Sequence, residues 1–221
     1  MKAADAARIF LVDDHPLVRE SLANLIEHQP DLTVCGEADH PATARSGIAA
    51  TKPDVAIVDL SLGDGSGLSL IRDLHATNPE IAVLVLSMYD EDVYAERVLR
   101  AGARGYIMKR EVSQNVILAI RRVREGKVYL SPRMTTTLAE KLVRGAPAAD
   151  QSPVTLLSDR ELEVFRLVGQ GRATRQIADS LHLSPKTVQA FSARIKEKLG
   201  LASSTELLRE AIRWVEDQRE R

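Results

Sequence analysis

The sequence predicts a parallel α/β sheet domain followed by an all-helical domain. Short apolar runs alternate with helix-period segments five times over residues 8–125, as in a doubly wound parallel sheet. Residues 145–155 are rich in Gly, Ala and Pro and lack periodicity, which is typical of a linker. From Ser158 onward the pattern is helical, and no strand-like run follows.

The candidate strands are five apolar runs, at 8–12, 32–36, 55–59, 82–87 and 105–109. The third and fourth runs are apolar throughout, as expected of strands that helices cover on both faces. Apolar residues recur at helical spacing in the segments that follow them, at 17–28, 41–51, 66–77, 91–101 and 112–125. We therefore expect a five-stranded, doubly wound parallel sheet with right-handed connections.

The predicted domain boundaries follow from these patterns. The sheet domain covers residues 1–130, one further helix (132–144) and the linker cover 131–155, and the helical domain covers 156–221. Four helices are predicted in the helical domain, at 159–169, 174–181, 185–199 and 204–218. Ser158 and Glu161 have capping-box spacing at the first of them. Ser184 followed by Pro185 suits the start of the third.

The composition is that of an ordinary globular protein, with 44% hydrophobic residues and a net charge of −1. Residues 1–130 are mildly acidic and the remainder mildly basic, which suggests different partners. No apolar run approaches the roughly 20 residues that span a bilayer, and the N-terminus lacks the apolar core of a signal peptide, so we expect a cytoplasmic protein. The single cysteine, Cys35, excludes an internal disulfide and a cysteine-based zinc site, and we expect it to be buried packing.

Side chains suited to a cation and a phosphoryl group follow the predicted strands. Ligands of open parallel sheets bind at the carboxyl ends of the strands. Those ends carry Asp13, Asp14, Asp59, Ser87 and Lys109. Three carboxylates at one edge repel each other unless a cation joins them, and hard oxygen ligands suit Mg²⁺. The sequence therefore predicts a magnesium site at which the hydroxyl and the ammonium hold a phosphoryl group.

Asp59 is the candidate nucleophile, because it ends the central strand and precedes a glycine-rich loop that leaves room for approach. A carboxylate can attack phosphorus and form an aspartyl phosphate, while Mg²⁺ and Lys109 stabilise the transition-state charge. Simpler interpretations stay open at this point. Asp14 could cap the following helix, and Tyr106 could be half-buried packing. His15 lies at a helix start and is not expected to be catalytic.

The stretches "VDDHPLVRESL", "VDLSLGDGSGL", "SMYDED" and "RAGARGYIMK" resemble the receiver domain of bacterial response regulators, over about residues 8–126. The resemblance implies the flavodoxin-like strand order 2-1-3-4-5 for the parallel sheet. It implies that Asp59 is the phospho-acceptor. It also implies a metal site formed by Asp13, Asp14, Asp59 and the main-chain carbonyl of Ser61.

The same resemblance implies a switch pair, Ser87 and Tyr106, in which the hydroxyl turns toward the phosphoryl group and the aromatic ring moves inward. It implies that Lys109 contacts the phosphate. The chain departs from the family at two positions. Arg110 stands where many receivers have proline, so no cis-proline is expected, and Gly63 stands where proline is frequent, so a more mobile loop is expected.

The helices predicted at 174–181 and 185–199 are joined by a short turn, as in a helix-turn-helix. A helical wheel places one apolar face on the second helix, formed by Val188, Phe191, Ile195 and Leu199. The opposite face consists of Lys186, Gln189, Ala190, Ala193 and Glu197, and is short enough to enter a DNA major groove. Candidate phosphate contacts flank it, namely Thr187, Arg194 and Lys196, with Thr174 and Arg175 on the preceding helix. A surface helix with scattered charge would show the same spacing.

Residues 157–201 resemble the four-helix DNA-binding domain of the NarL/FixJ regulators, which is of the LuxR type. The resemblance implies that Lys186, Gln189, Ala190 and Ala193 face DNA. Because two of these are alanines, sequence preference would depend on the other two and on DNA shape. Phe191 stands where relatives often have His or Tyr. The resemblance also implies dimerisation through the last helix, whose apolar stripe is Leu207, Leu208, Ala211, Ile212 and Val215.

These observations predict a response regulator transcription factor, not an enzyme. A sensor histidine kinase or a small acyl phosphate would phosphorylate Asp59 in a Mg²⁺-dependent reaction. This would alter interdomain docking and favour a homodimer on paired DNA half-sites, without any membrane partner. One alternative is a Mg²⁺-dependent phosphohydrolase, although such enzymes usually have an acid two residues after the nucleophile, where this chain has Ser61. Another is a DNA-binding protein whose sheet domain is only a dimer scaffold.

Overall fold

The structure is a computed structural model that describes residues 6–62, 65–144, 153–181 and 183–220. The chain divides into two compact units, Met1–Thr137 and Leu138–Arg221. Each unit is described by itself below. The division falls a few residues after the predicted boundary at 130, because the first turn of the next helix packs on the sheet unit.

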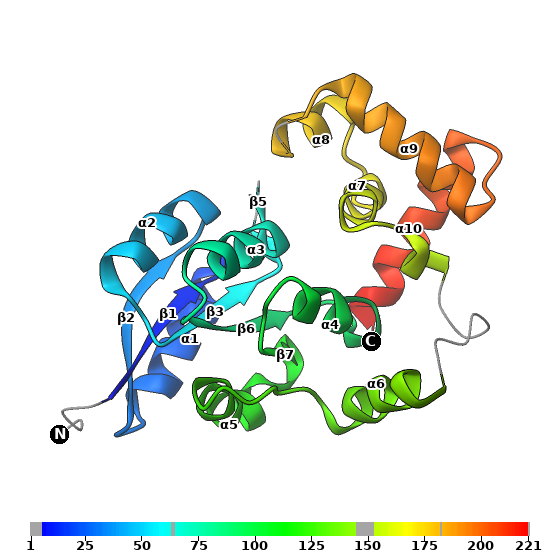
Figure 1. Cartoon of the computed structure of the whole chain (residues 1–221). Helices are drawn as coiled ribbons and strands as arrows, with labels where there is room; N and C mark the ends of the chain where they lie inside the picture. The colour runs from blue at the N-terminus through cyan, green and yellow to red at the C-terminus, as the bar shows by residue number, and fades with distance from the viewer. Residues whose placement is uncertain (1–5, 63–64, 145–152, 182, 221) are drawn as a thin grey trace. The chain divides into compact units, whose positions relative to one another are not determined.

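The first unit holds a five-stranded parallel sheet in the order β2-β1-β3-β6-β7 (Figure 1). These strands are β1 Ala7–Val12, β2 Leu32–Ala38, β3 Val55–Asp59, β6 Ala82–Ser87 and β7 Gly105–Met108. They are the five predicted strands in chain order, so the predicted order 2-1-3-4-5 is confirmed. A separate antiparallel pair, β4 Ser61–Leu62 and β5 Gly65–Ser66, follows β3 and is not predicted by the sequence.

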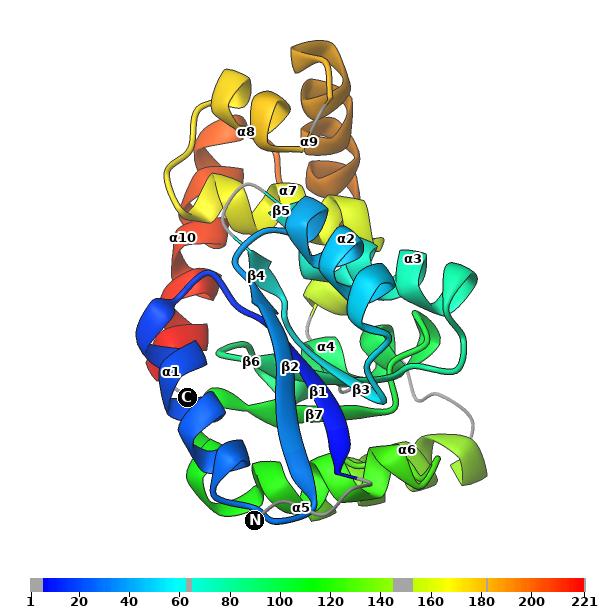
Figure 2. The ribbon, with the colours of Figure 1, turned by 90° about the vertical axis from the view of Figure 1, so that its left-hand side faces the viewer.

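Helices cover both faces of this sheet, which lies between α1 on one side and α2 and α3 on the other (Figure 2). The helices of this unit are α1 Pro16–Glu27, α2 Pro41–Thr51, α3 Gly67–Thr77, α4 Glu91–Arg100 and α5 Val112–Arg124. On the α1 and α5 face, Leu22 and Ile120 pack with Ile57 and Leu84 in one buried cluster. Because both faces are covered, the central strands β3 and β6 are buried along their whole length.

The exposed margin of the sheet corrects one expectation. Cys35 is half-buried rather than buried, because β2 is an edge strand and only its two terminal residues are buried. No cis peptide bond occurs among the residues that the structure describes, in agreement with Arg110 in place of a proline. The expectation of a mobile loop at Gly63 lies outside the described residues.

The remaining elements are helical. They are α6 Pro132–Arg144, a 3-10 turn at Pro153–Leu156, α7 Asp159–Gly169, α8 Thr174–Ser180, α9 Pro185–Leu199 and α10 Ser204–Glu220. Of the predicted linker 145–155, residues 145–152 lie outside the described residues, and the last three belong to the 3-10 turn. The four predicted helices of the C-terminal domain are confirmed.

Local chemistry explains where the helices of the second unit, Leu138–Arg221, begin and end. Ser158 and Glu161 form the predicted capping box at the start of α7. Ser184 accepts the amide hydrogen of Thr187 at the start of α9, and Pro185 occupies the first turn. The helix α9 ends at Leu199, and Gly200 follows as its C-cap with a φ of 66°, which suits a residue without a Cβ atom.

The core of this unit is built where α7 and α10 cross. The rings of Phe165 and Trp214 lie 5.7 Å apart between centroids. A Cβ atom on Gly169 would lie 2.3 Å from the main-chain oxygen of Ala211, so this glycine permits the close approach of the two helices.

Candidate functional sites

Acidic side chains gather at the carboxyl edge of the sheet, as predicted. Asp13, Asp14 and Asp59, together with His15, each offer a ligand atom, and all these atoms lie within 4.8 Å of one another. The end of β1 supplies the first two carboxylates and the end of β3 the third, because neighbouring parallel strands finish at the same edge. Asp13 and Asp59 are almost completely buried, whereas the side chain of Asp14 is 29% exposed.

One cation joins two of these carboxylates. The Lys109 Nζ atom lies 2.7 Å from Asp59 Oδ2 and 2.6 Å from Asp13 Oδ2. Burial disfavours the charged ammonium, but the carboxylates of Asp59 and Asp13 outweigh it and raise the pKa of Lys109. The lysine is therefore positively charged at neutral pH and offsets part of the repulsion between the two acids.

Asp59 occupies an environment that disfavours its charge. Burial raises the pKa of its carboxyl group to about 6; Lys109 opposes this shift and Asp13 adds to it. The backbone N–H of Ser61 donates to Asp59 Oδ1 at 3.1 Å. The group is still largely a carboxylate at pH 7, which a nucleophile requires.

His15, rather than Asp14, occupies the N-cap position of α1. Its backbone N–H donates to Asp13 Oδ1 at 2.9 Å, and its ring Nδ1 lies 2.7 Å from Asp14 Oδ1. The interpretation of Asp14 as the cap of this helix is therefore wrong, and its carboxylate belongs to the acidic cluster.

The predicted switch residues also meet at this edge. Ser87 is fully buried, and its Oγ accepts the Tyr89 N–H at 3.1 Å. Tyr106 is 1% exposed rather than half-buried, and its hydroxyl donates to the main-chain oxygen of Tyr89 at 2.7 Å. Burial raises the pKa of the Tyr106 phenol well above its ordinary value, so the phenol stays protonated and can donate this bond.

Sequence reasoning missed two residues of this site. Tyr89 accepts the Ser61 Oγ–H at 2.6 Å and stacks on Tyr94, with ring centroids 5.0 Å apart. Gly67 begins α3 directly beneath the end of β3, and a Cβ atom there would lie 2.1 Å from the main-chain oxygen of Asp59. The glycine-rich stretch after Asp59 was a signal for the second residue, but the first depends on contacts that spacing does not reveal.

The residues present fit a hard divalent cation. Their donors are carboxylate oxygens, the ligands that Mg²⁺ prefers, and three carboxylates facing one ammonium leave an excess of negative charge at the cluster.

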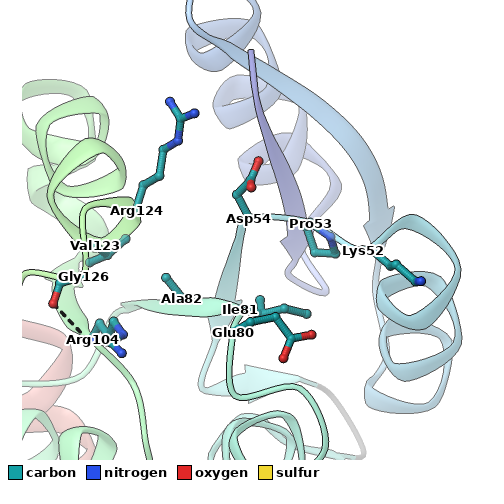
Figure 3. Close-up of a pocket in the computed structure, with 10 residues that line it drawn as sticks. All are labelled: Lys52, Pro53, Asp54, Glu80, Ile81, Ala82, Arg104, Val123, Arg124 and Gly126. Atoms are coloured by element: carbon teal, nitrogen blue, oxygen red, sulfur yellow. Dashed lines mark hydrogen bonds between the residues drawn. The ribbon is translucent and has the colours of Figure 1, made fainter. Parts of the chain in front are cut away.

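A pocket of about 450 Å³ lies at the opposite, amino edge of the sheet (Figure 3). Asp54 and Ile81, which precede β3 and β6, line it together with residues at the end of α5. Figure 3 shows the charged ends of Lys52, Glu80 and Arg124 spread around its rim rather than converging on one point. The pocket is therefore separate from the acidic cluster and does not contribute to it.

The helix α9 presents the predicted exposed face. Val188 and Ile195 are buried, and Phe191 and Leu199 are half-buried on the same side. The opposite side is exposed and consists of Lys186, Gln189, Ala190, Ala193 and Glu197, with Arg194 beside it. Thr174 and Arg175, at the start of α8, are exposed as well. Thr187 is half-buried, and its Oγ1 lies 2.8 Å from Ser184 Oγ.

The predicted stripe on α10 divides into two parts. Leu207, Ala211 and Val215 are buried in the core of this unit, and Trp214, which the sequence analysis did not place there, joins them. Leu208 and Ile212 remain 41% and 37% exposed. No helix in the described parts of the chain is long and apolar enough to cross a lipid bilayer.

Comparisons with known proteins match both parts of the chain. Residues 9–121 match the response regulator receiver domain, and residues 155–211 match the bacterial regulatory proteins of the luxR family. The chain belongs to the response regulators that join a receiver domain to a LuxR-type DNA-binding domain, a class of phosphorylation-dependent transcription regulators.

Two individual relatives cover nearly the whole chain, and a third covers part of it. The oxygen regulatory protein NreC of Staphylococcus aureus is 36% identical over 210 residues, which are 93% of this chain and 97% of that protein. The crystal structure of a LuxR-family response regulator from Aurantimonas sp. is 33% identical, with a TM-score of 0.58. The match covers 62% of this chain and 99% of that protein's chain. The structure of RcsB from Salmonella enterica serovar Typhimurium, bound to the promoter rprA, has a TM-score of 0.71. The match covers 94% of this chain and 98% of the RcsB chain. At 24% sequence identity it shows a shared fold alone.

Proposed function

We propose that the chain accepts a phosphoryl group on Asp59 and uses this modification to control DNA binding by its helical unit. The observation that carries the proposal is the ion pair between Lys109 and Asp59, which lies at the edge where Asp13 and Asp14 also converge. A buried carboxylate, a buried ammonium and two further acids at one sheet edge suit phosphoryl transfer better than a purely structural role.

In this proposal Mg²⁺ is held by Asp13, Asp14 and Asp59, with the main-chain carbonyl of Ser61 as a further ligand. When bound, the ion neutralises phosphoryl charge and orients the donor. One Asp59 oxygen attacks phosphorus, and the bond from phosphorus to the donor breaks, which is a P–N bond in a kinase phosphohistidine or a P–O bond in an acyl phosphate. Lys109 keeps its charge throughout and binds the oxygens of the transferred group.

The response then passes to the switch pair. Ser87 lies next to the site and its hydroxyl can donate to the phosphoryl group, while the buried Tyr106 ring holds the backbone of Tyr89. The protein would act as a switch with two conformations, not as an enzyme with turnover. The position two residues after Asp59 is Ser61, which lacks the acid that a phosphohydrolase would use to protonate its leaving group.

We propose a sensor histidine kinase and double-stranded DNA as the partners. The exposed face of α9 would enter the major groove, with Thr174, Arg175, Thr187 and Arg194 near phosphates. Leu208 and Ile212 would contact a second copy of the chain, which would place two such helices on paired half-sites. The domain boundaries at 130 and 155 fit this division of roles.

The experiment that tests this function compares wild type with Asp59→Asn, using Asp39→Asn, an exposed acid elsewhere on the receiver, as the control. Each protein is incubated with acetyl phosphate and Mg²⁺ and its intact mass is measured. The affinity of each protein for DNA is then measured, with DNA that the wild type has selected from a random-sequence pool. Wild type and the control should gain one phosphoryl group and bind DNA more tightly, and Asp59→Asn should do neither. An unchanged response in Asp59→Asn would leave only the dimer-scaffold alternative.

A further inference from the structure

A single arginine joins the start of α6 to three consecutive acidic residues at the start of α4. Arg133 Nη1 lies 3.0 Å from Asp92 Oδ2, and its Nε lies 3.3 Å from Glu91 Oε1. Its Nη2 lies 3.7 Å from Asp90 Oδ1. Ser131, just before α6, donates its hydroxyl to the same Glu91 Oε1 at 2.7 Å. We call Arg133 and these three acids the α6–α4 clamp.

Two of the three acids of the clamp are buried, so their carboxylates need charged or hydrogen-bonding partners. Asp90 and Glu91 are only 4% and 5% exposed, so their charges are costly to bury alone. Asp90 caps α4 by accepting the Asp92 N–H at 2.9 Å, and the helix N-terminus stabilises all three. The first turn of α6 is thus fixed to the start of α4 by these charged contacts, and Met134 in the same turn is buried.

The loop that holds the clamp is also the loop that contacts the phosphoryl site. Tyr89, which directly precedes Asp90, donates its N–H to Ser87 Oγ and accepts the Tyr106 hydroxyl at its main-chain oxygen. Its own hydroxyl accepts the Ser61 Oγ–H. If the Ser87 hydroxyl turned toward a phosphoryl group on Asp59, its hydrogen bond with the Tyr89 amide would have to change. Because Asp90 directly follows Tyr89, the clamp would be displaced as well.

At its other end, α6 continues into the helical unit. The division between the two units falls inside this helix, between Thr137 and Leu138, one turn after Arg133. A shift of the clamp therefore acts on a helix that belongs to both units.

We propose that the α6–α4 clamp couples the receiver switch to the DNA-binding unit, with Arg133 as the positioning residue. This rests on the proposed function, because the signal that the clamp transmits is a phosphoryl group on Asp59. Breaking the clamp should release α6 from the β6–α4 loop and leave the chemistry of Asp59 intact.

Arg133→Gln tests the proposal, because it removes the charge and keeps a polar side chain. Arg100→Gln is the matched control, since Arg100 lies on α4 and forms an ion pair along that helix with Glu96. Three quantities are measured for each protein. These are the phosphorylation rate with acetyl phosphate and Mg²⁺, the amide hydrogen exchange of residues 131–137, and the gain in affinity for pool-selected DNA on phosphorylation.

We expect Arg133→Gln to be phosphorylated at the wild-type rate. Its 131–137 amides should exchange at least fivefold faster before phosphorylation, and its gain in DNA affinity should fall at least threefold. Arg100→Gln should match wild type in all three measurements.

A full gain in DNA affinity in Arg133→Gln would overturn the clamp proposal while leaving the phosphorylation of Asp59 in place. An absence of labelling in wild type would overturn the proposed function itself, and the clamp proposal with it. The phosphorylation rate therefore separates the two failures.

Discussion

Lys109 Nζ lies 2.7 Å from Asp59 Oδ2, so the residue proposed to accept the phosphoryl group is already paired with the residue proposed to bind it. The same ammonium reaches Asp13, which lies among the proposed metal ligands. A metal ion held by these acids would therefore share its carboxylates with Lys109, and the lysine charge would weaken the binding of the ion.

Lys109→Gln should strengthen Mg²⁺ binding and slow phosphorylation. Removing a positive charge near a divalent ion relieves repulsion of ~1 kcal/mol, which corresponds to roughly fivefold tighter binding. Loss of the charge that stabilises the transition state should slow phosphorylation about a hundredfold. Calorimetric titration with Mg²⁺ and the rate of labelling by acetyl phosphate measure the two effects. The control is Lys127→Gln at an exposed position, and weaker Mg²⁺ binding by Lys109→Gln would contradict the prediction.

Mg²⁺ affinity should fall in acid with a break near pH 6. The pKa of Asp59 is raised to about 6, so its carboxyl group is neutral below that pH and must lose a proton before it binds the ion. The dissociation constant should then increase up to about tenfold per pH unit below the break and stay level above pH 7. Calorimetric titration between pH 5 and 8 measures it. In Asp59→Asn the break near pH 6 should be absent, and its persistence there would assign it to another group.

Gly67→Ala should impair phosphorylation more than folding. The added Cβ atom would lie 2.1 Å from the Asp59 main-chain oxygen and 2.7 Å from Leu60 Cα, so the end of β3 must move. A displacement of ~1 Å at the nucleophile can slow phosphorylation about a hundredfold. Gly126→Ala is the control for the destabilisation that follows loss of a glycine away from the site, because its φ of 77° disfavours alanine while its nearest neighbour is an Arg104 atom 4.0 Å away. Labelling rates and melting temperatures are compared, and a normal rate in Gly67→Ala would refute the prediction.

Two substitutions separate base reading from phosphate binding in the helical unit. Gln189→Leu should cost about 1–3 kcal/mol on selected DNA and little on random DNA. Arg175→Ala should weaken binding to both DNAs. It should also reduce the slope of log K against log salt concentration by roughly one, because one phosphate contact is lost. Fluorescence anisotropy at several salt concentrations gives these quantities. Equal losses on both DNAs for both variants would show that α9 is not the reading helix.

The divided stripe of α10 predicts a contrast between neighbouring leucines. Leu208 is 41% exposed, so Leu208→Glu should reduce dimer formation of the phosphorylated protein at least tenfold and leave the melting temperature nearly unchanged. Leu207 is 3% exposed, so Leu207→Glu buries a charge and should unfold the domain. Sedimentation equilibrium and thermal melting distinguish the two. Intact dimers in both Leu208→Glu and Ile212→Glu would place the dimer contact elsewhere.

Local patterns predict most of this fold. The strands follow from apolar runs such as 55–59 and 82–87, because a strand that is covered on both faces needs no alternation. The start of α7 follows from Ser158 and Glu161, which satisfy each other's backbone within four residues. The position of the acidic cluster is also predictable, because the carboxyl ends of neighbouring parallel strands lie at the same edge of the sheet.

What the sequence does not predict depends on contacts between distant segments. The burial of Tyr106, the bridging role of Tyr89 and the clamp at Arg133 each join residues from separate elements. A helical wheel identifies the apolar stripe of α10, but it cannot tell which residues meet α7, so Leu208 and Leu207 look equivalent.

The helix α9 is held by residues other than those that would read DNA. Val188 and Ile195 anchor it in the core, and Lys198 Nζ lies 2.7 Å from Glu161 Oε2 at the start of α7. Lys186 and Gln189 lie on the opposite, exposed side. Substitutions there change the chemistry offered to base pairs at little cost in folding free energy. Descendants of a duplicated gene could therefore acquire new operators by point mutation while inheriting an unaltered scaffold.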